Sequence, residues 1–465
     1  MEWYSVLPPL IAIGVVLWKK EVILALLMAI ISSEYLLVLH HSEGSSLQGM
    51  VLSGFLNTIE RIIGVVSSAG NSRLLIFSLL IGALLAYIRN SGGVKATVEM
   101  LTSKGIAKNE RQVGFLTMFT GMSLFIESNL SVLTAGIVSR GLFDKFKMSR
   151  ARLAFIIDST SAPMCILVLL NGWGAYVLGL LSNYELEESA VSILWGTIPF
   201  NFYAIITLLI VFYTVSSKKV FGPMKQAEKE LVKHENIGAN HDDIKPTKAR
   251  FMILPLATMI FGMIGFMLWT GNGHITQGSG GKSVLYATIL ALVVAYVLLI
   301  SYKRYNHKEL VDIGFNGMSE LLPLVTIVLF SLTLGASLKE LGTGVFIANV
   351  VGDFLPMVLV VPILFLTGAV IAFSTGTSWG TFAILIPIAV PLIQTLGLPP
   401  SLVIAAVLGG GVFGDHCSPI SDTTCIAAIA SGCDLLTHVK TQLPYALFGG
   451  TLTFIAYFVA SLVMI

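Results

Sequence analysis

The fold of this chain is decided by two similar stretches, Asp158-Ser159-Thr160-Ser161-Ala162-Pro163 and Asp415-His416-Cys417-Ser418-Pro419. Each stretch places an aspartate within a long apolar region, one in each half of the sequence. A carboxylate at the depth of a lipid bilayer is costly, and it therefore usually marks a path for ions, protons or a substrate. Two such stretches predict a transporter made of two repeats, with its binding site between them.

The composition is that of a membrane protein. The 465 residues are 55% hydrophobic and 12% charged, and the mean hydropathy is +0.85. A soluble domain has roughly twice this share of charged residues, about 25%. Apolar runs long enough to cross a bilayer recur along the chain, which predicts an all-α polytopic membrane protein with about 10–12 membrane segments. The net charge of +2 does not indicate a nucleic-acid partner.

Candidate membrane spans and the charges between them suggest an orientation. The spans cover residues 5–18, 21–39, 73–90, 153–180, 190–215, 252–270, 283–301, 319–338, 401–430 and 443–463. Basic residues gather in the connections 90–111 and 140–152, whereas the connection after residue 180 carries glutamates. Because cytoplasmic loops carry an excess of lysine and arginine, the basic connections are expected inside and the glutamate-rich one outside.

The apolar segment 113–139 does not fit a simple crossing. It runs between the two basic connections, so a single crossing would place one of them outside. It is also interrupted by Glu127-Ser128-Asn129. Irregular backbone survives at membrane depth only when it is buried in protein or lines a wet cavity. We therefore expect a re-entrant hairpin here, or a span broken at its midpoint.

The two halves of the chain share further short matches in the same order. Gly54-Phe55 is matched by Gly314-Phe315, and Phe77-Ser78-Leu79 is matched by Phe330-Ser331-Leu332. Such a series indicates an internal repeat. Counting the crossings gives the two repeats inverted topology, which lets a transporter open alternately to each side. The same symmetry predicts a second hairpin at 356–396, entering from the outside.

These observations divide the chain into five parts. The stretch 216–250 has mixed charge and separates the halves, so we expect it to be a cytoplasmic linker. The parts are 1–49, N-terminal membrane helices and a candidate scaffold or dimer face; 50–215, repeat 1 with its hairpin near 113–139; 216–250, the linker; 251–310, connecting membrane helices; and 311–465, repeat 2 with its hairpin near 356–396.

Polar residues from four segments are expected to meet near the middle of the membrane. They offer carboxylate, hydroxyl and amide oxygens beside helix breaks, and such donors suit a hard cation such as Na⁺. The candidate ion- or substrate-binding residues are Asp158, Asp415, Glu127, Asp422, Asn129, Ser159, Thr160, Ser161, Thr375, Thr377, Ser378, Ser418 and Thr423. Asp158 and Asp415 are the candidate Na⁺ ligands, because a buried carboxylate can hold either a proton or a metal cation.

Several of these residues also have structural interpretations. Asp415 and Asp422 could each cap a broken helix by accepting backbone N–H bonds. The hydroxyls could be small packing residues between membrane helices. His416 could relay protons in the physiological range, or it could make a structural hydrogen bond.

A resemblance to a known family is found in the second aspartate stretch. The run Phe413–Thr424 resembles the signature of the NhaC family of sodium/proton antiporters, and Asp158–Pro163, Thr377–Thr381 and Thr441–Ala446 are similar to the same family. The resemblance implies an ion-transporter-type fold with inverted repeats and paired hairpins, and Na⁺/H⁺ exchange at the inner membrane of a bacterium. Many members carry two adjacent aspartates and an aromatic residue where this chain has Glu127-Ser128-Asn129, which leaves the ion stoichiometry open.

The sequence therefore predicts a secondary active transporter that exchanges Na⁺ for H⁺ by alternating access, through buried carboxylates that bind either cation. No cofactor is expected besides the transported ions. The expected partners are the lipid bilayer, Na⁺ and H⁺, with no nucleic acid and with a homodimer through residues 5–39 as an option.

Other functions are open to different degrees. The alternative is a Na⁺- or H⁺-coupled transporter of a small organic anion or amino acid, although no arginine lies within the central motifs to pair with a carboxylate. An enzyme is not expected, because Gly411-Val412-Phe413-Gly414-Asp415 has valine where intramembrane aspartyl proteases require glycine. A channel is disfavoured, because the acids form isolated pairs and not rings around a pore.

Overall fold

The computed structural model describes residues 3–19, 21–41, 47–93, 96–97, 109–125, 127–229, 247–274 and 278–465. The predicted linker and the first basic connection are covered in part, since residues 230–246 and 98–108 lie outside the described residues. The described elements are helices, which confirms the all-α prediction.

The helices follow one another along the chain with short connections. The first half comprises η1 (Trp3–Val6), α1 (Leu7–Lys19), α2 (Val22–His41), α3 (Leu47–Ser67), α4 (Ala69–Asn90), α6 (Glu110–Ser123), α7 (Ser128–Lys145), α8 (Arg150–Val168), α9 (Gly172–Leu181), α10 (Ala190–Gly196), η2 (Ile198–Phe200) and α11 (Phe202–Ser217). After α12 (Gly222–Lys229), the second half comprises α13 (Arg250–Thr270), α14 (Gly280–Ser301), α15 (His307–Glu320), α16 (Leu322–Leu341), α17 (Thr343–Phe354), α18 (Met357–Thr375), α19 (Ser378–Leu396), α20 (Pro400–Cys417), α21 (Asp422–Ser431) and α22 (Leu435–Met464). Within the described residues, 12 segments are long and apolar enough to cross a membrane, as the composition predicts.

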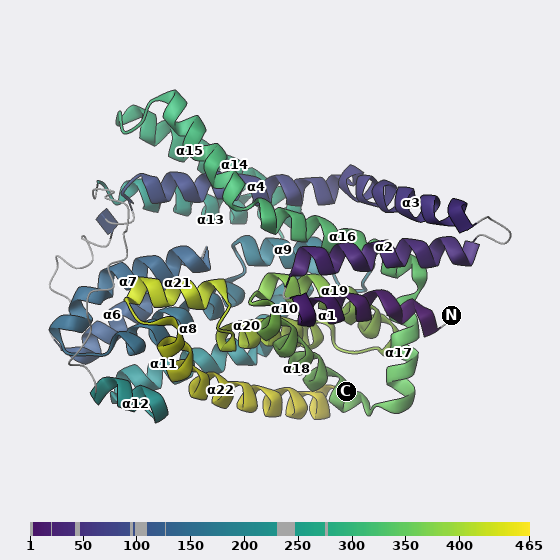
Figure 1. The fold of residues 1–465 in the computed structure, drawn as a ribbon. Coiled ribbons are helices and arrows are strands. Elements are labelled where there is room, and N and C mark those ends of the chain that lie inside the picture. The colour runs from purple at the N-terminus through teal and green to yellow at the C-terminus, as the bar shows by residue number, and fades with distance from the viewer. Residues whose placement is uncertain are drawn as a thin grey trace.

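The order of helices in the first half is matched in the second. Helices α1–α4 correspond to α13–α16, the pair α6–α7 corresponds to α18–α19, and α8–α9 correspond to α20–α21. Figure 1 shows α6 and α7 toward one end of the molecule and α18 toward the other, as expected for repeats of inverted topology. The limits of the two repeats stay a prediction.

Each of the two segments predicted to be hairpins consists of two helices with a break between them, and re-entry from one side of the membrane stays a prediction. In the first, the break lies between Ser123 and Ser128. In the second, it lies between Thr375 and Ser378, where Gly376 has φ +68. This left-handed conformation favours glycine, and a Cβ atom on Gly376 would lie only 2.5 Å from the carbonyl oxygen of Ile420. The glycine therefore lets the tip of the hairpin pack against the break between α20 and α21.

Two predicted spans, 153–180 and 401–430, are wrong in length, because each is two helices. Helix α8 ends at Leu169, which has φ +58, and α9 starts after Asn171, whose side chain accepts the N–H of Gly174 at 3.1 Å. The break after α20 contains Pro419, which has no N–H with which to continue a helix. Because apolar residues lie on both sides of each break, each pair of helices was predicted from the sequence as a single span.

Helix α3 adds a span that the sequence prediction omits. Residues Gly49–Ser67 of this helix are apolar enough to cross a membrane. The span was omitted because Glu60 and Arg61 interrupt the apolar run in the sequence. Helix α3 continues almost in line with α4, and α15 packs against α4 (Figure 1). The crossing is close, because a Cβ atom on Gly82 or on Gly317 would lie 2.3 Å from the carbonyl oxygen of the other glycine.

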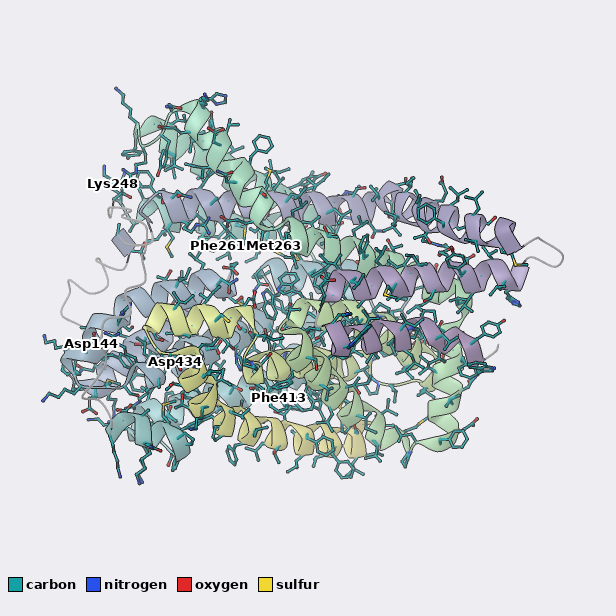
Figure 2. All side chains as sticks on the ribbon, in the orientation of Figure 1. Asp144, Lys248, Phe261, Met263, Phe413 and Asp434 are labelled. Carbon is teal, nitrogen blue, oxygen red and sulfur yellow. The ribbon has the colours of Figure 1, made fainter. Side chains whose placement is uncertain are left out.

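Helix α20 lies at the centre of the molecule. All residues from Leu402 to Cys417 are buried, and Figure 2 shows Phe413 in the interior. Asp144 and Lys248 lie toward one end of the molecule in the same view. Asp144 belongs to the second basic connection and Lys248 to the end of the linker. Segments that were predicted to be cytoplasmic thus share one end of the fold.

Candidate functional site

A cavity of about 300 Å³, here called the inner cavity, lies where the tips of the two hairpins meet α4, α9, α16 and the break between α20 and α21. Helix breaks free backbone groups and place polar side chains at membrane depth, which is tolerated only around such a cavity. Six of the predicted site residues line it, namely Glu127, Asn129, Thr377, Asp415, Asp422 and Thr423. The inner cavity thus brings together carboxylates from both halves of the chain.

Asp415 lies near the end of α20 and is only 2% exposed. Its Oδ2 accepts a hydrogen bond from the Ser378 hydroxyl at 2.8 Å, across the tip of the second hairpin. Its Oδ1 is buried without a hydrogen-bond partner among the described residues. Since Asp415 is inside α20 and three residues before its C-terminal cap, the interpretation of this aspartate as an N-terminal cap is wrong. A buried acceptor with an unused oxygen is an arrangement suited to a proton or a cation.

Glu127 has a structural role. It is the N-cap of α7, and its two carboxylate oxygens accept the N–H groups of Asn129 at 3.0 Å and Leu130 at 2.6 Å. A negative side chain at this position also interacts favourably with the helix dipole. The carboxylate is therefore already engaged by backbone donors at the edge of the inner cavity.

Asp422 lines the inner cavity and is more exposed than Glu127 and Asp415, the other predicted carboxylates there. The exposed Glu320 of α15 lines the same cavity. The N-cap of α21 is Ser421, which accepts the N–H of Thr424 at 3.3 Å. The capping interpretation of Asp422 holds in part, because its Oδ1 accepts the N–H of Thr423 at 2.8 Å. Asp422 follows as the first residue of the helix and leaves its side chain at the cavity wall.

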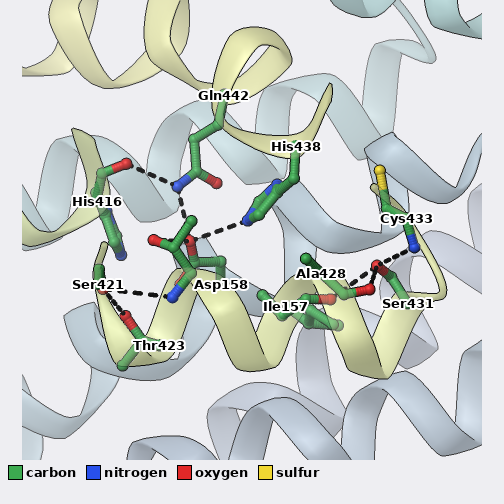
Figure 3. A network of polar contacts seen from close by, with 12 residues as sticks. Ile157, Asp158, His416, Ser421, Thr423, Ala428, Ser431, Cys433, His438 and Gln442 are labelled. Atoms are coloured by element: carbon green, nitrogen blue, oxygen red, sulfur yellow. Dashed lines mark hydrogen bonds and ion pairs between the residues drawn. The ribbon is translucent and has the colours of Figure 1, made fainter. Parts of the chain in front are cut away.

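Asp158 lies in a separate polar cluster and is not among the residues that line the inner cavity. It is fully buried on α8, and its Oδ2 accepts hydrogen bonds from Gln442 Nε2 at 2.7 Å and from the Thr424 hydroxyl at 3.4 Å. The Nε2 atom of His438 lies 3.3 Å from the same oxygen. Gln442 also donates to the backbone carbonyl of His416 at 3.0 Å (Figure 3). Four helices, α8, α20, α21 and α22, therefore meet at this carboxylate.

The cluster around Asp158 contains two buried histidines. His416 is 1% exposed, and its Nδ1 lies 3.2 Å from the Tyr203 hydroxyl, while His438 is 0% exposed. His416 Nε2, His438 Nδ1 and Asp158 Oδ1 have no hydrogen-bond partner within the described residues. Imidazoles change charge near physiological pH more readily than other side chains. The arrangement is therefore chemically suited to holding and passing a proton.

Most of the remaining predicted hydroxyls bond to the backbone. Thr160, Ser161 and Thr375 donate to carbonyls of their own helices, at 2.7, 2.8 and 2.9 Å. Ser418 donates to the carbonyl of Phe373 at 2.7 Å and so joins the end of α20 to α18. Ser159 is buried beside Asp158 on α8. The hydrogen bonds of these four hydroxyls, on Thr160, Ser161, Thr375 and Ser418, agree with the interpretation as packing residues. Ser378 differs, because its hydroxyl donates to the carboxylate of Asp415.

Two functional candidates were missed in the sequence, His438 and Gln442. They are four residues apart on α22, so they share one face of that helix. Polar side chains at this spacing in an apolar helix usually face the protein interior. That spacing was a usable signal, but nothing in the sequence showed that this face would meet Asp158.

Comparisons with known proteins give a family and a fold. A model described as the Na⁺/H⁺ antiporter family matches residues 164–462. An uncharacterized protein of Haemophilus influenzae is 31% identical over 98% of this chain and 90% of its own length. The arginine/ornithine antiporter ArcD of Halobacterium salinarum is 34% identical, over 34% of this chain and 33% of its own.

A solved structure shares the architecture. MtrF of Neisseria gonorrhoeae, described with a class of antimetabolite efflux pumps, has a TM-score of 0.59 at 15% identity, with 94% of each chain covered. At this identity the likeness concerns the fold alone.

Proposed function

We propose that this chain, which belongs to the Na⁺/H⁺ antiporter family, exchanges Na⁺ for H⁺ across a membrane by alternating access. The observation on which the proposal rests is Asp415 at the inner cavity, with one carboxylate oxygen held by Ser378 and the other without a partner among the described residues. A proton and Na⁺ compete for such an oxygen, because each neutralises the same buried charge. Na⁺ and H⁺ can then be exchanged at Asp415 without a covalent step.

The other oxygens at the inner cavity complete the proposed cation site. Asn129, Thr377, Asp422 and Thr423 bring amide, hydroxyl and carboxylate oxygens from both hairpins and from α21 to the same wall. Na⁺ is a hard cation and favours oxygen ligands of this kind. Because the donors come from both repeats, a movement of one repeat against the other would assemble or separate the site.

Asp158 supplies a second ionisable group in this proposal. We assign it as a proton site and not as a direct Na⁺ ligand, because His438 and Gln442 contact its Oδ2 and because Asp158, unlike Asp415, is not among the residues that line the inner cavity. This assignment differs from the sequence analysis, in which Asp158 and Asp415 are both candidate Na⁺ ligands. The proposal also includes a bacterial inner membrane as the location of the protein and a homodimer as one oligomeric state.

Proton movement into liposomes tests the proposal. Purified protein is reconstituted with a pH-sensitive dye inside, and a Na⁺ gradient is imposed without organic solutes, then replaced by a K⁺ gradient. We expect Na⁺-driven proton movement in the unmodified protein and none in Asp415→Asn or Asp158→Asn. Asp434→Asn is the matched control, because asparagine keeps the N-cap function of Asp434 on α22. Exchange at the unmodified rate in Asp415→Asn would contradict the proposed site.

A second candidate function is the transport of an amino acid coupled to an ion. The relative ArcD, which matches a third of this chain, exchanges arginine for ornithine by its name. The specific observation that favours this function is Arg61, whose guanidinium lies in a large cavity beside α3. The central sequence motifs contain no arginine that could pair with the carboxylate of an amino acid, and Arg61 supplies such a positive charge.

A further inference from the structure

We propose that a second, larger cavity binds an amino acid, preferably one with a positively charged side chain. This cavity, here called the outer cavity, measures about 840 Å³ and lies between α2, α3, α4, α9, α16 and α19. The inference rests on the second candidate function above and names its binding site. It is independent of Na⁺/H⁺ exchange at the inner cavity.

The size of the outer cavity fits a small organic solute. Ligand pockets in proteins commonly measure roughly 300–1,000 Å³, and this cavity is near the upper end of that range. A bare or partly hydrated Na⁺ needs only a few oxygen ligands at short distance. The volume therefore exceeds what ion exchange alone requires.

A charged triad lies on the wall of the outer cavity. Arg61 Nε lies 2.8 Å from Glu34 Oε1, and Arg61 Nη1 lies 2.7 Å from Glu340 Oε2. Glu34 is 1% exposed, and it belongs to a candidate membrane span, as does Arg61. Ionisable groups within membrane spans are rare and usually mark a substrate or ion path. The side chain of Arg61 is 24% exposed and lines the outer cavity, so it lies within reach of a solute there.

Two further charged side chains line the outer cavity. Glu60 and Lys339 both line it, both are exposed, and neither makes an ion pair within the described residues. An ammonium group of a solute can pair with Glu60, and a carboxylate can pair with Lys339. The three guanidinium nitrogens of Arg61 already contact Glu34 and Glu340, and the N–H groups that remain of its five can also donate to a solute carboxylate. An amino acid carries both an ammonium group and a carboxylate, which match the opposite charges of Glu60 and Lys339.

The balance of charge selects among amino acids. Three acids, Glu34, Glu60 and Glu340, line the outer cavity together with two bases, Arg61 and Lys339. The excess of negative charge disfavours a simple organic anion and favours a solute with a net positive charge. Arginine or lysine therefore fits better than alanine, and alanine fits better than glutamate.

The outer cavity and the inner cavity share part of their walls. Helices α4, α9, α16 and α19 line both. On α9, Trp173 lines the inner cavity and Leu180 the outer one, with the buried Tyr176 between them in the sequence. The rings of Tyr176 and Trp379 are 4.9 Å apart, and those of Trp173 and Trp379 are 5.6 Å apart. These packed aromatic rings therefore lie on helices that a solute in the outer cavity would share with the inner cavity.

Binding of radiolabelled L-arginine to the purified full chain in detergent tests the inference, with unlabelled alanine and glutamate as competitors. We expect saturable arginine binding that alanine displaces weakly and glutamate least. Glu60→Gln and Lys339→Gln should each weaken binding about tenfold, as expected when one charge-assisted hydrogen bond is lost. Lys308→Gln, at an exposed lysine of α15 outside the cavity, is the matched control and should bind normally.

Arg61→Gln alone would leave Glu34 buried without its partner and could fail to fold. The double variant Glu34→Gln/Arg61→Gln removes both charges, and it should fold but bind arginine poorly. The absence of saturable binding of any of the three amino acids, stronger binding of glutamate than of arginine, or normal binding in all cavity variants would each overturn the inference. Asp415→Asn should still bind arginine, and Glu60→Gln should still exchange Na⁺ for H⁺ without solute, so that failure of either proposal is recognised separately.

Discussion

Replacement of Gln442 by alanine should show how much the contacts of Asp158 stabilise the protein. Gln442 Nε2 donates to Asp158 Oδ2 at 2.7 Å, whereas the contacts from His438 and Thr424 are longer, at 3.3 and 3.4 Å. A hydrogen bond to a charged group contributes about 1.5–3 kcal/mol, and the bond from Gln442 to the carbonyl of His416 contributes about 1 kcal/mol. We therefore expect Gln442→Ala to lower the free energy of unfolding by ~2.5–4 kcal/mol.

The assay is an unfolding titration of the purified protein in mixed detergent and SDS, followed by circular dichroism. Thr441→Ala is the control, since Thr441 is equally buried but donates only to carbonyls of its own helix, at 2.8 and 2.9 Å. Gln442→Glu should be less stable than Gln442→Ala, because it places a second carboxylate beside Asp158. Equal unfolding midpoints for Gln442→Ala and Thr441→Ala would refute the assignment of Gln442 as the main partner of Asp158.

Two further variants test the fold and the division of roles among the acids. Gly82→Ala would place a Cβ atom 2.3 Å from the carbonyl oxygen of Gly317, which forces α4 and α15 apart and should cost about 1–3 kcal/mol in the same titration. Gly64→Ala, which meets no atom within 4 Å, should be neutral or stabilising, and a similar loss in both would contradict the close crossing. Glu127→Gln should retain Na⁺/H⁺ exchange in liposomes while Asp415→Asn loses it, because Glu127 acts as a helix cap; loss of exchange in both variants would show that Glu127 also binds the ion.

The fold was predictable from the sequence to the extent that it depends on hydrophobicity and charge. The break at Glu127-Ser128-Asn129 and the basic connections around it were enough to predict the first hairpin, and repeat symmetry was enough for the second. The breaks within 153–180 and 401–430 were not predicted, because they depend on backbone conformation at Leu169 and on Pro419. Hydropathy averaged over about 19 residues does not register a break of two or three residues.

The site was predictable as a set of residue types, and less so as an arrangement. The six cavity residues were among those expected, because each combines a polar oxygen with a helix break. Asp158 was expected in the same site, yet contacts between α8 and α22 place it in a separate cluster. These contacts join residues that are 280 or more positions apart in the sequence. A pattern of neighbouring residues in the sequence therefore cannot predict them.

The two aspartates become chemically different because the repeats end in different helices. Asp158 and Asp415 occupy matching helices, α8 and α20, so the duplication alone would give them equal surroundings. Helix α22 of the second half, however, presents His438 and Gln442 to Asp158, whereas α11 of the first half is rich in apolar residues and contributes Tyr203 to His416. Each aspartate has one oxygen without a hydrogen-bond partner among the described residues. Side chains of α21 and α22 contact the other oxygen of Asp158, whereas Asp415 is the aspartate of the pair that lines the inner cavity. In the mechanism proposed above, a single duplicated motif would therefore supply both an internal proton site and a cation site at the inner cavity.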